Sequence, residues 1–297
     1  MLLWLLRTLS LAPLWLLHAL GAAGGWLAFL LSRGFRRKTV DNLRTAGLYS
    51  ARLAWASAAG AGKAALESCY IWFRSDEDLL RKSRFDAFAR LAEATEASRA
   101  QGDRRGIILL TPHIGSFEMG GRAYGASAPI TVLYKAPRRE DLHQLLKVAR
   151  TRTRVTMVPA NTGGVRALLR ALRRGEAIGI LPDQVPSAGD GVWSPFFGRP
   201  AFTMTLPSRL AEKTGAPVYL LASWRRPFGR GWDLELSKLD GLPTPDAINQ
   251  ALEMIIRQRP QQYVWNYNRY KGPAPAQETS AATAAAVPRQ SAHADDL

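Results

Sequence analysis

The sequence predicts an α/β protein with a mainly parallel central sheet, flanking helices and an N-terminal helix that anchors it in a membrane. Three observations support this prediction: a long uncharged apolar segment near the start, a helix-rich region after it, and short apolar runs that alternate with helical stretches from residue 107 onward. Such alternation is typical of parallel strands joined by helices. We expect an anchor with its basic flank over residues 1–37, one α/β domain over 38–271, and a disordered tail over 272–297.

The composition of the 297-residue chain favours a folded protein with polyanionic partners. Hydrophobic residues make up 47% and charged residues 22%, which excludes general disorder. Forty lysines and arginines against 24 acidic residues give a formal charge of +16. This charge favours nucleic acid, anionic lipid, a phosphorylated substrate or an acidic carrier protein as the partner. Cys69 is the only cysteine, which excludes an internal disulfide and a multi-cysteine metal site and suits a reducing compartment.

The apolar segment at residues 8–32 carries no formal charge and is long enough to cross a bilayer core of about 30 Å. Pro13, His18 and several glycines weaken it, so a helix lying in one leaflet is the alternative. A cleaved signal peptide is disfavoured, because apolar residues continue through Leu31 and a basic cluster follows directly. The charges at residues 33–38 are all positive, which predicts that the rest of the chain lies on the cytoplasmic side.

The following elements are expected from hydrophobic periodicity and turn signals. Residues 38–100 are expected to be helical, because aromatic and apolar residues recur among alanines and charges with almost no turn signals. Strands are expected at residues 106–111, 130–134, 177–181, 218–224 and 232–236. Helices are expected at residues 141–150, 165–174 and 208–213, the last two closed by glycine. A final helix begins with Thr244 as its cap and Pro245 in its first turn.

His113 is the strongest catalytic candidate, because it follows a buried strand directly. The other three histidines, His18, His143 and His293, lie in the apolar segment, on an expected helix surface and in the tail. Glu118 can reach His113 only if the histidine is in a loop and the acid is in the first turn of the next helix. A carboxylate bonded to one imidazole nitrogen leaves the other nitrogen free to activate a hydroxyl nucleophile. The alternative interpretation is a hydrogen-bonded loop histidine without a catalytic role.

Other candidates are basic or follow strands. Lys147, Arg150 and Arg154 would share one face of a continuing helix, with Lys135, Arg138 and Arg139 just upstream, as a cradle for phosphates or an acidic protein. The alternative is a solvated basic face. Asp183 directly follows an apolar strand, where α/β proteins place binding residues, although a turn-forming Pro-Asp pair explains it equally well. Phe196, Phe197 and Phe202 could line an acyl channel or belong to the core.

Residues 106–120 resemble the H-x4-D/E block of the glycerolipid acyltransferases, and in particular of the late lauroyl and myristoyl acyltransferases of lipid A biosynthesis. Further blocks agree in order: R-R-x4-N-L at 36–43, L-P-D-Q at 181–184, F-F-G at 196–198 with Thr203, and P-x-Q-Y-x-W-x3-R-Y-K at 260–271. The single N-terminal anchor matches too, so the resemblance covers about residues 1–271. Several ordered blocks are more specific than any one of them.

The resemblance implies acyl transfer from an acyl carrier protein thioester to a hydroxyl of a lipid A precursor, at the cytoplasmic face of the inner membrane of a Gram-negative bacterium. It implies no metal, no cofactor beyond the acyl donor and no nucleic-acid partner; the expected partners are the carrier protein, the glycolipid and membrane lipids. By position, His113 is the general base and Glu118 its orienting partner.

The substrate-binding positions that the resemblance implies are Lys135, Arg150, Asp183 and Gln184. The chain departs from the family at the first of these, because the family often reads Tyr-Arg-Pro where this sequence has Tyr134-Lys135-Ala136-Pro137. Lysine keeps a point charge for a phosphate but loses the bidentate fork of arginine.

Three other functions compete with acyl transfer to lipid A. A serine hydrolase using Ser116 would need G-x-S-x-G and a suitable later histidine, which the sequence lacks. The glycines and lysine of residues 60–63 fail as a Walker motif, because Ser57 and Ala64 stand where it requires glycine and a hydroxyl residue. A non-enzymatic basic membrane-surface protein would explain the charge but not His113. The acceptor could also be another glycolipid or a lysophospholipid.

Overall fold

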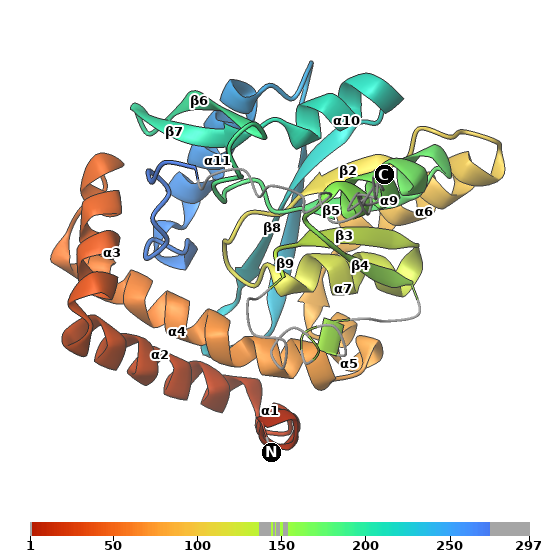
Figure 1. Ribbon diagram of the computed structural model, residues 1–297. Coiled ribbons are helices and arrows are strands. Elements are labelled where there is room, and N and C mark those ends of the chain that lie inside the picture. Colours follow the sequence, from red (N-terminus) through yellow and green to blue (C-terminus); the bar gives the residue numbers. More distant parts are fainter. Residues whose placement is uncertain (1, 137–143, 145, 147–148, 151–153, 274–297) are drawn as a thin grey trace, which may run out of the picture.

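A seven-stranded, mostly parallel sheet forms the centre of the protein in the computed structural model, which describes residues 2–136, 144, 146, 149–150 and 154–273 (Figure 1). Within those residues the strand order is β1-β9-β8-β2-β5-β3-β4, and only the β8–β9 pair is antiparallel. The strands are β1 Ser83–Arg84, β2 Ile107–Leu110, β3 Ile130–Tyr134, β4 Val155–Pro159, β5 Ala177–Ile180, β8 Val218–Arg225 and β9 Trp232–Lys238. The expected α/β fold with a mainly parallel sheet is confirmed.

Helices cover both faces of the sheet. Those described are α1 Leu2–Ser10, α2 Leu14–Leu31, α3 Arg33–Thr45, α4 Ala51–Phe73, α5 Asp76–Arg81, α6 Asp86–Ala100, α7 Glu118–Ser127, α9 Thr162–Arg173, α10 Leu206–Thr214 and α11 Pro245–Gln258, with the short 3-10 turns η1 Pro227–Gly229 and η2 Pro260–Gln262. Successive side chains of a strand point to opposite faces. Ile108 and Leu110 of β2 therefore join a core with α9, α10 and α11, while Ile107 and Leu109 join a second core with α6 and α7.

Most elements lie where the sequence places them. The five expected strands are present, and the region of residues 38–100 is mostly helical, with strand β1 between α5 and α6. Helix α11 begins at Pro245, and the Thr244 hydroxyl accepts a hydrogen bond from the amide of Ala247. The expected helix at 141–150 falls largely outside the described residues, and so does the tail beyond residue 273.

Three pieces of sheet were not expected. The short strand β1 interrupts the region expected to be helical and pairs in parallel with β9. The edge strand β4 begins at Val155, so Arg154 lies in a turn before a strand and not on a helix with Arg150. A separate antiparallel hairpin joins β6 Gly191–Phe196 to β7 Arg199–Met204. Proline normally argues against a strand because it cannot donate to the ladder. Pro195 and Pro200 pair with each other in this two-stranded ribbon.

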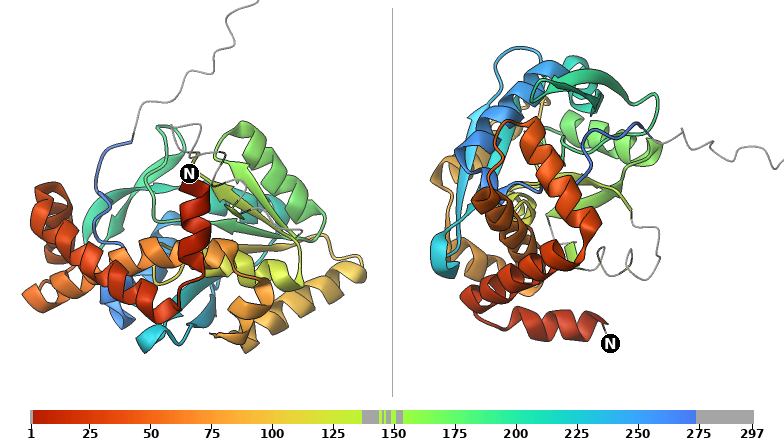
Figure 2. Two further views of the ribbon diagram at one scale, coloured as in Figure 1. Left: turned by 90° about the horizontal axis from the view of Figure 1, so that it is seen from below. Right: turned by 90° about the vertical axis from the view of Figure 1, so that its left-hand side faces the viewer.

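The N-terminal apolar helix α2 packs lengthwise along α4 on the side away from the sheet, so it is an outer layer of the protein (Figures 1 and 2). Glycines allow the two backbones to meet. A Cβ atom on Gly25 would lie 2.0 Å from the carbonyl oxygen of Ala58, and one on Gly62 would lie 1.9 Å from that of Gly21. The segment expected as a separate anchor is therefore packed tightly against the body.

We expect Gly25→Ala to destabilise the protein, because the added methyl group forces α2 away from α4. Overpacking of this kind costs about 1–3 kcal/mol. Gly24→Ala is the matched control: its Cβ would meet no atom within 4 Å, and alanine should stabilise an open helical site by about 0.5–1 kcal/mol. Urea unfolding midpoints measure both effects. Equal midpoint shifts in the two variants would contradict the close backbone contact between α2 and α4.

Candidate active site

Two loops that leave neighbouring parallel strands bring the central polar residues together. Leu110 at the end of β2 pairs with Ile180 at the end of β5, and the amide of Thr111 donates to the carbonyl of Ile180 over 2.9 Å. His113 and Asp183 each lie three residues beyond this matched pair. The carboxyl edge of a parallel sheet is where α/β proteins place their functional groups. The register alone thus sets the imidazole opposite the carboxylate.

Asp183 holds His113 through two hydrogen bonds. The Nδ1 atom of His113 lies 2.8 Å from Oδ1 of Asp183, and the backbone amide of His113 donates to Oδ2 over 2.9 Å. The Asp183 side chain is 2% exposed, whereas that of His113 is 18% exposed. Burial acts to raise the pKa of the Asp183 carboxyl, but the charge of His113 and its two hydrogen bonds outweigh burial and lower this pKa. The partner of the ring is therefore an ionised carboxylate.

The second imidazole nitrogen faces an amide. Since Nδ1 donates its hydrogen to Asp183, Nε2 of the neutral ring is an acceptor. The side-chain amide nitrogen of Gln184 lies 3.2 Å from Nε2 and donates to it. A partly exposed ring nitrogen with a lone pair is a position from which a base can remove a proton. Gln184, expected as a substrate-binding residue, lies at this nitrogen.

The loop that carries His113 is fixed by β8, by the end of η2 and by the residue pair after it. Gly115 adopts a φ of +55°, and a Cβ atom there would lie 2.0 Å from the carbonyl oxygen of Ser223, so only glycine fits. The amide of Gly115 donates to the carbonyl of Gln262 over 2.8 Å, and the carbonyl of His113 accepts from the amide of Val264 over 3.1 Å. The imidazole is therefore presented by a rigid backbone.

Glu118 does not hold His113, which corrects the expected contact. It is the first residue of α7, as expected, but its carboxylate pairs with the guanidinium of Arg150, and the described residues include no hydrogen bond between Glu118 and His113. Five residues of separation carry Glu118 past the imidazole, and Asp183 occupies the Nδ1 side. Arg150 also lies over the ring of Trp72, 5.4 Å from its centroid. These contacts place the Glu118–Arg150 pair between α4 and α7.

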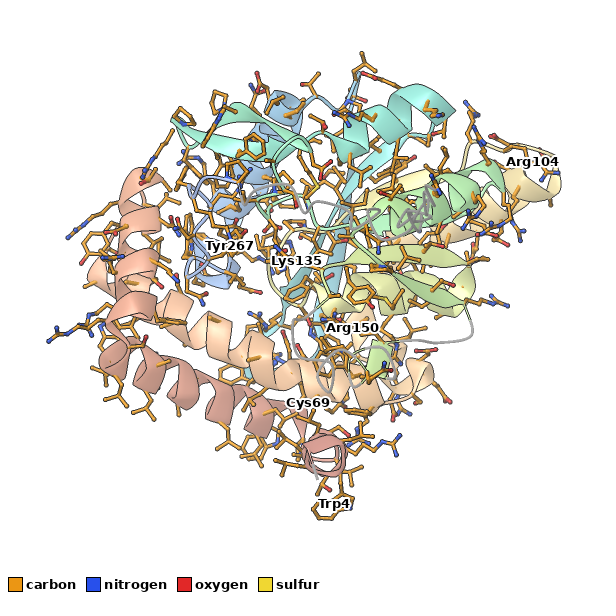
Figure 3. All side chains as sticks on the ribbon, viewed as in Figure 1. Trp4, Cys69, Arg104, Lys135, Arg150 and Tyr267 are labelled. Atoms are coloured by element: carbon orange, nitrogen blue, oxygen red, sulfur yellow. The ribbon has the colours of Figure 1, made fainter. Side chains whose placement is uncertain are left out.

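The other basic residues that the sequence analysis proposed for substrate binding do not form one group in the described structure. Lys135 is exposed just beyond the end of β3, and its charge opposes the rise in pKa that burial gives the Tyr267 hydroxyl, so the two groups are neighbours (Figure 3). That hydroxyl accepts a hydrogen bond from the amide of Val185, which ties Tyr267 to the loop of Asp183. Arg154 instead donates to the carbonyl of Ser127. Arg138, Arg139 and Lys147 of the expected basic cradle lie outside the described residues.

Two alternative roles find no support in the described contacts. The Ser116 side chain is buried, and its hydroxyl has no hydrogen-bond partner in the part of the chain that the structure describes, so His113 does not activate it. Phe196, Phe197 and Phe202 are core residues: the first two stack edge to face with ring centroids 4.8 Å apart, and the third packs on Trp193. Of the two interpretations given for these phenylalanines, their burial favours the core over an acyl channel.

A small apolar cavity adjoins the site between α7 and the sheet. Its volume is about 30 Å³, and its walls come from β2, β3, β5 and the start of α7. The lining residues are Leu109, Thr111, Phe117, Gly120, Gly121, Ile130, Val132, Gly179, Ile180 and Leu181. Three glycines in the wall keep this space open, and Phe117 also contacts His113, with ring centroids 4.7 Å apart.

A buried charged cluster that the sequence analysis did not predict contacts the loop of His113. Glu67 on α4 is 1% exposed and binds Nε2 of His18 over 3.0 Å, Nε of Arg225 over 2.5 Å and Nε1 of Trp232 over 3.3 Å. Burial acts to raise the pKa of Glu67, but Arg225 and His18 outweigh it and lower this pKa. Arg225 also donates to the carbonyl of Gly115 over 2.5 Å. The cluster therefore connects α2 to the loop of His113.

Comparison with known proteins agrees with the expected family. The sequence model of a family described as bacterial lipid A biosynthesis acyltransferase matches residues 1–272. A lipid A biosynthesis palmitoleoyltransferase of Escherichia coli is 28% identical over 219 residues, which are 71% of this chain and 68% of that protein. A lipid A biosynthesis lauroyltransferase of the same organism is 26% identical over 71% of this chain and 69% of its own length. A lipid A biosynthesis acyltransferase of Haemophilus influenzae is also 26% identical, over 71% of this chain and 67% of its own length.

Proposed function

Because the chain belongs to the bacterial lipid A biosynthesis acyltransferases, we propose that it moves a fatty acyl chain from an acyl carrier protein thioester to a hydroxyl of a lipid A precursor. One observation carries the assignment of the site: a partly exposed imidazole whose Nδ1 is bonded to a buried, ionised carboxylate. This arrangement is the one that general-base activation of a hydroxyl requires.

The chemistry follows from the two ring nitrogens. The acceptor hydroxyl replaces the Gln184 amide at Nε2 of His113. Nε2 then removes the proton from this hydroxyl as its oxygen attacks the thioester carbonyl. The tetrahedral intermediate collapses, the carbon–sulfur bond breaks, and the imidazolium returns the proton to the departing thiolate. Asp183 keeps Nδ1 protonated and stabilises the imidazolium between the two steps. The reaction is balanced without a cofactor, and the acyl carrier protein is a substrate.

Arg150 is the residue that we assign to binding an anionic part of the substrate, such as a phosphate of the glycolipid or the acidic carrier protein. Glu118 and Trp72 hold its guanidinium, and its buried Nε has no hydrogen-bond partner among the described residues. The Arg150 side chain is 21% exposed, and a planar, permanently charged guanidinium suits a phosphate or carboxylate. Glu118 is then a positioning residue for Arg150, while Lys135 and Gln184 contribute at the same edge of the sheet.

We expect Arg150→Ala to raise KM about 10-fold or more while changing kcat less, because it removes charge-assisted binding and leaves the base intact. Steady-state kinetics with varied glycolipid and varied carrier protein would show which substrate the guanidinium contacts. Arg154→Ala is the control, since that side chain bonds only a carbonyl in the described region and is exposed. A loss confined to kcat would contradict a binding role.

The experiment that tests the whole proposal offers the purified chain an acyl carrier protein thioester with three acceptors: a lipid A precursor, a different glycolipid and a lysophospholipid. Mass spectrometry of the products identifies the acyl group and the acceptor. We expect acylation of the lipid A precursor, at the cytoplasmic face of the inner membrane in the cell. Transfer to another acceptor would show that the acyltransferase acts on that lipid and not on a lipid A precursor. Binding to lipid without any transfer would favour a basic membrane-surface protein.

A further inference from the structure

An apolar surface without a protein partner covers the outer side of α1 and α2. The following side chains on it are large, hydrophobic and 45% or more exposed: Trp4, Leu5, Leu11, Trp15, Leu20, Trp26, Leu27, Leu30 and Leu31. Trp4 projects away from the body at the end of α1 (Figure 3). We call this set, together with Phe228, the outer apolar face. A face of this size on a globular protein marks a contact with lipid or with another protein.

The inner side of α2 is fully occupied by the body of the protein. Its buried residues are Leu14, Leu17, His18, Gly21, Ala22, Gly25 and Phe29, which recur every three or four positions along one side of the helix. His18 bonds Glu67, which bonds Arg225 of the central sheet. Removing α2 would leave a buried carboxylate short of a partner, which is costly. Helix α2 therefore stays on α4.

The packing of α2 on α4 limits the ways in which α2 can bind a membrane. Among the described residues, α2 is the one helix long and apolar enough to cross a bilayer, with about 27 Å of length at 1.5 Å per residue. Crossing would carry α4 into the hydrocarbon beside it, with Lys63 and Glu67. Helix α4 in turn touches the segment after α11, where a Cβ on Gly60 would lie 2.3 Å from the carbonyl oxygen of Gln261. The crossing is therefore incompatible with the packing of the body.

The η1 turn extends the outer apolar face beyond α2. Phe228 is 84% exposed at its centre and adopts a φ of +57°, which is rare for a bulky residue. Next to it, a Cβ on Gly229 would lie 2.3 Å from the amide nitrogen of Trp15, so the turn rests on the start of α2. The guanidinium of Arg230 lies over the Phe228 ring, 5.7 Å from its centroid. An exposed aromatic side chain beside a cation suits the boundary between acyl chains and headgroups.

Charge identifies the partner as an anionic membrane. No acidic residue occurs before Asp41, and the exposed residues Arg7, Arg33, Arg37 and Lys38 flank the apolar segment on both sides. Basic residues beside an exposed apolar helix face are the signature of in-plane binding to anionic lipid. A second protein copy would place these positive charges against one another.

We propose that α1, α2 and the η1 turn form an in-plane bilayer-binding surface that inserts into one leaflet of an anionic membrane and does not cross it. Both ends of α2 and the catalytic site then lie on the same side of the membrane. This proposal rests on the location given in the proposed function, the cytoplasmic face of the inner membrane. Its tests measure topology and membrane binding and do not need acyl transfer.

The first test uses cysteine labelling of the full chain in a Cys69→Ala background. One reporter is a cysteine in a short hydrophilic extension before residue 1, and the other is Ser98→Cys, on an exposed position of α6. Spheroplasts and inverted inner-membrane vesicles are treated with a membrane-impermeant maleimide. We expect both reporters to react in inverted vesicles and neither to react in intact spheroplasts. Reaction of the two reporters from opposite sides would overturn the proposal.

The second test measures binding of the purified full chain to vesicles of phosphatidylcholine and phosphatidylglycerol. The double variant Trp15→Glu with Leu27→Glu should bind at least about 10-fold more weakly than the unchanged chain. The matched control is Leu242→Glu with Met254→Glu, two exposed apolar residues away from the outer apolar face, and it should bind normally. Equal binding of both variants, or a dimer that only the first variant abolishes, would overturn the proposal. Inactivity with normal labelling and binding would count only against the acyltransferase assignment.

Discussion

Replacing His113 by alanine is expected to lower kcat by about 10²–10⁴-fold, which is the usual contribution of a positioned general base. The reason is that Nε2 carries the lone pair of an imidazole that Asp183 holds at Nδ1. This nitrogen is partly exposed, and a substrate hydroxyl can replace the Gln184 amide beside it. Single-turnover measurement with a preloaded carrier protein isolates the chemical step from product release. KM for both substrates should change little.

The control for this variant is Asn161→Ala. It removes the side-chain cap of a different helix, α9, and touches neither loop of the site. It should lose about 1 kcal/mol of stability and keep its kcat. A His113→Ala variant that folds, binds the carrier protein and turns over at the original rate would refute the assignment of the base.

Asp183→Asn is expected to have an effect of similar size, a fall of up to about 10⁴-fold in kcat. The amide keeps the shape of the carboxylate but cannot stabilise the imidazolium, and it can favour the tautomer with the wrong nitrogen protonated. Glu118→Gln should reduce kcat far less, because that carboxylate contacts Arg150 and not the ring. The two variants together distinguish the carboxylates: the reverse order of effects would restore Glu118 as the partner of His113.

The same substitution should change how stability depends on pH. The pKa of Asp183 is lower in the folded protein than its ordinary value, so the carboxylate stabilises the fold above the unfolded-state pKa of about 3.9. That contribution disappears as the pH falls through the lowered folded-state pKa. The difference in unfolding free energy between the unchanged chain and Asp183→Asn should therefore shrink as the pH is lowered below about 4. A constant difference would contradict an ionised buried Asp183.

Several parts of the fold were predictable because local signals determine them. The apolar runs of β2, β3 and β5, the glycine that ends α10 and the cap of α11 all follow from neighbouring residues. Strand order is a different matter. The chain visits β2, β3 and then β5, but β5 lies between the other two. No local sequence pattern indicates that β5 lies between β2 and β3. This position of β5 beside β2 makes the loops of His113 and Asp183 neighbours.

The sequence therefore predicted which residues belong to the site, but it did not predict that Asp183 would be the partner of His113. One signal was present: both strands continue into a proline followed by the functional residue, as Thr111-Pro112-His113 and Leu181-Pro182-Asp183. Equal spacing after two strands aligns the residues only when the strands are adjacent. Glu118 was the nearest acid in sequence, yet the start of α7 directs it to Arg150. Glu67 was hidden among the apolar residues of α4, because its partners come from segments far away in sequence.

The chain of contacts through Glu67 has a consequence for biosynthesis. Helix α2 is synthesised before α4 and β8: Glu67 follows His18 by 49 residues, and Arg225 comes a further 158 residues later. During most of translation the carboxylate lacks the guanidinium that compensates its burial, while the apolar helix is already outside the ribosome. Final docking of the nascent enzyme is a late event, completed when the strand bearing Arg225 joins the sheet.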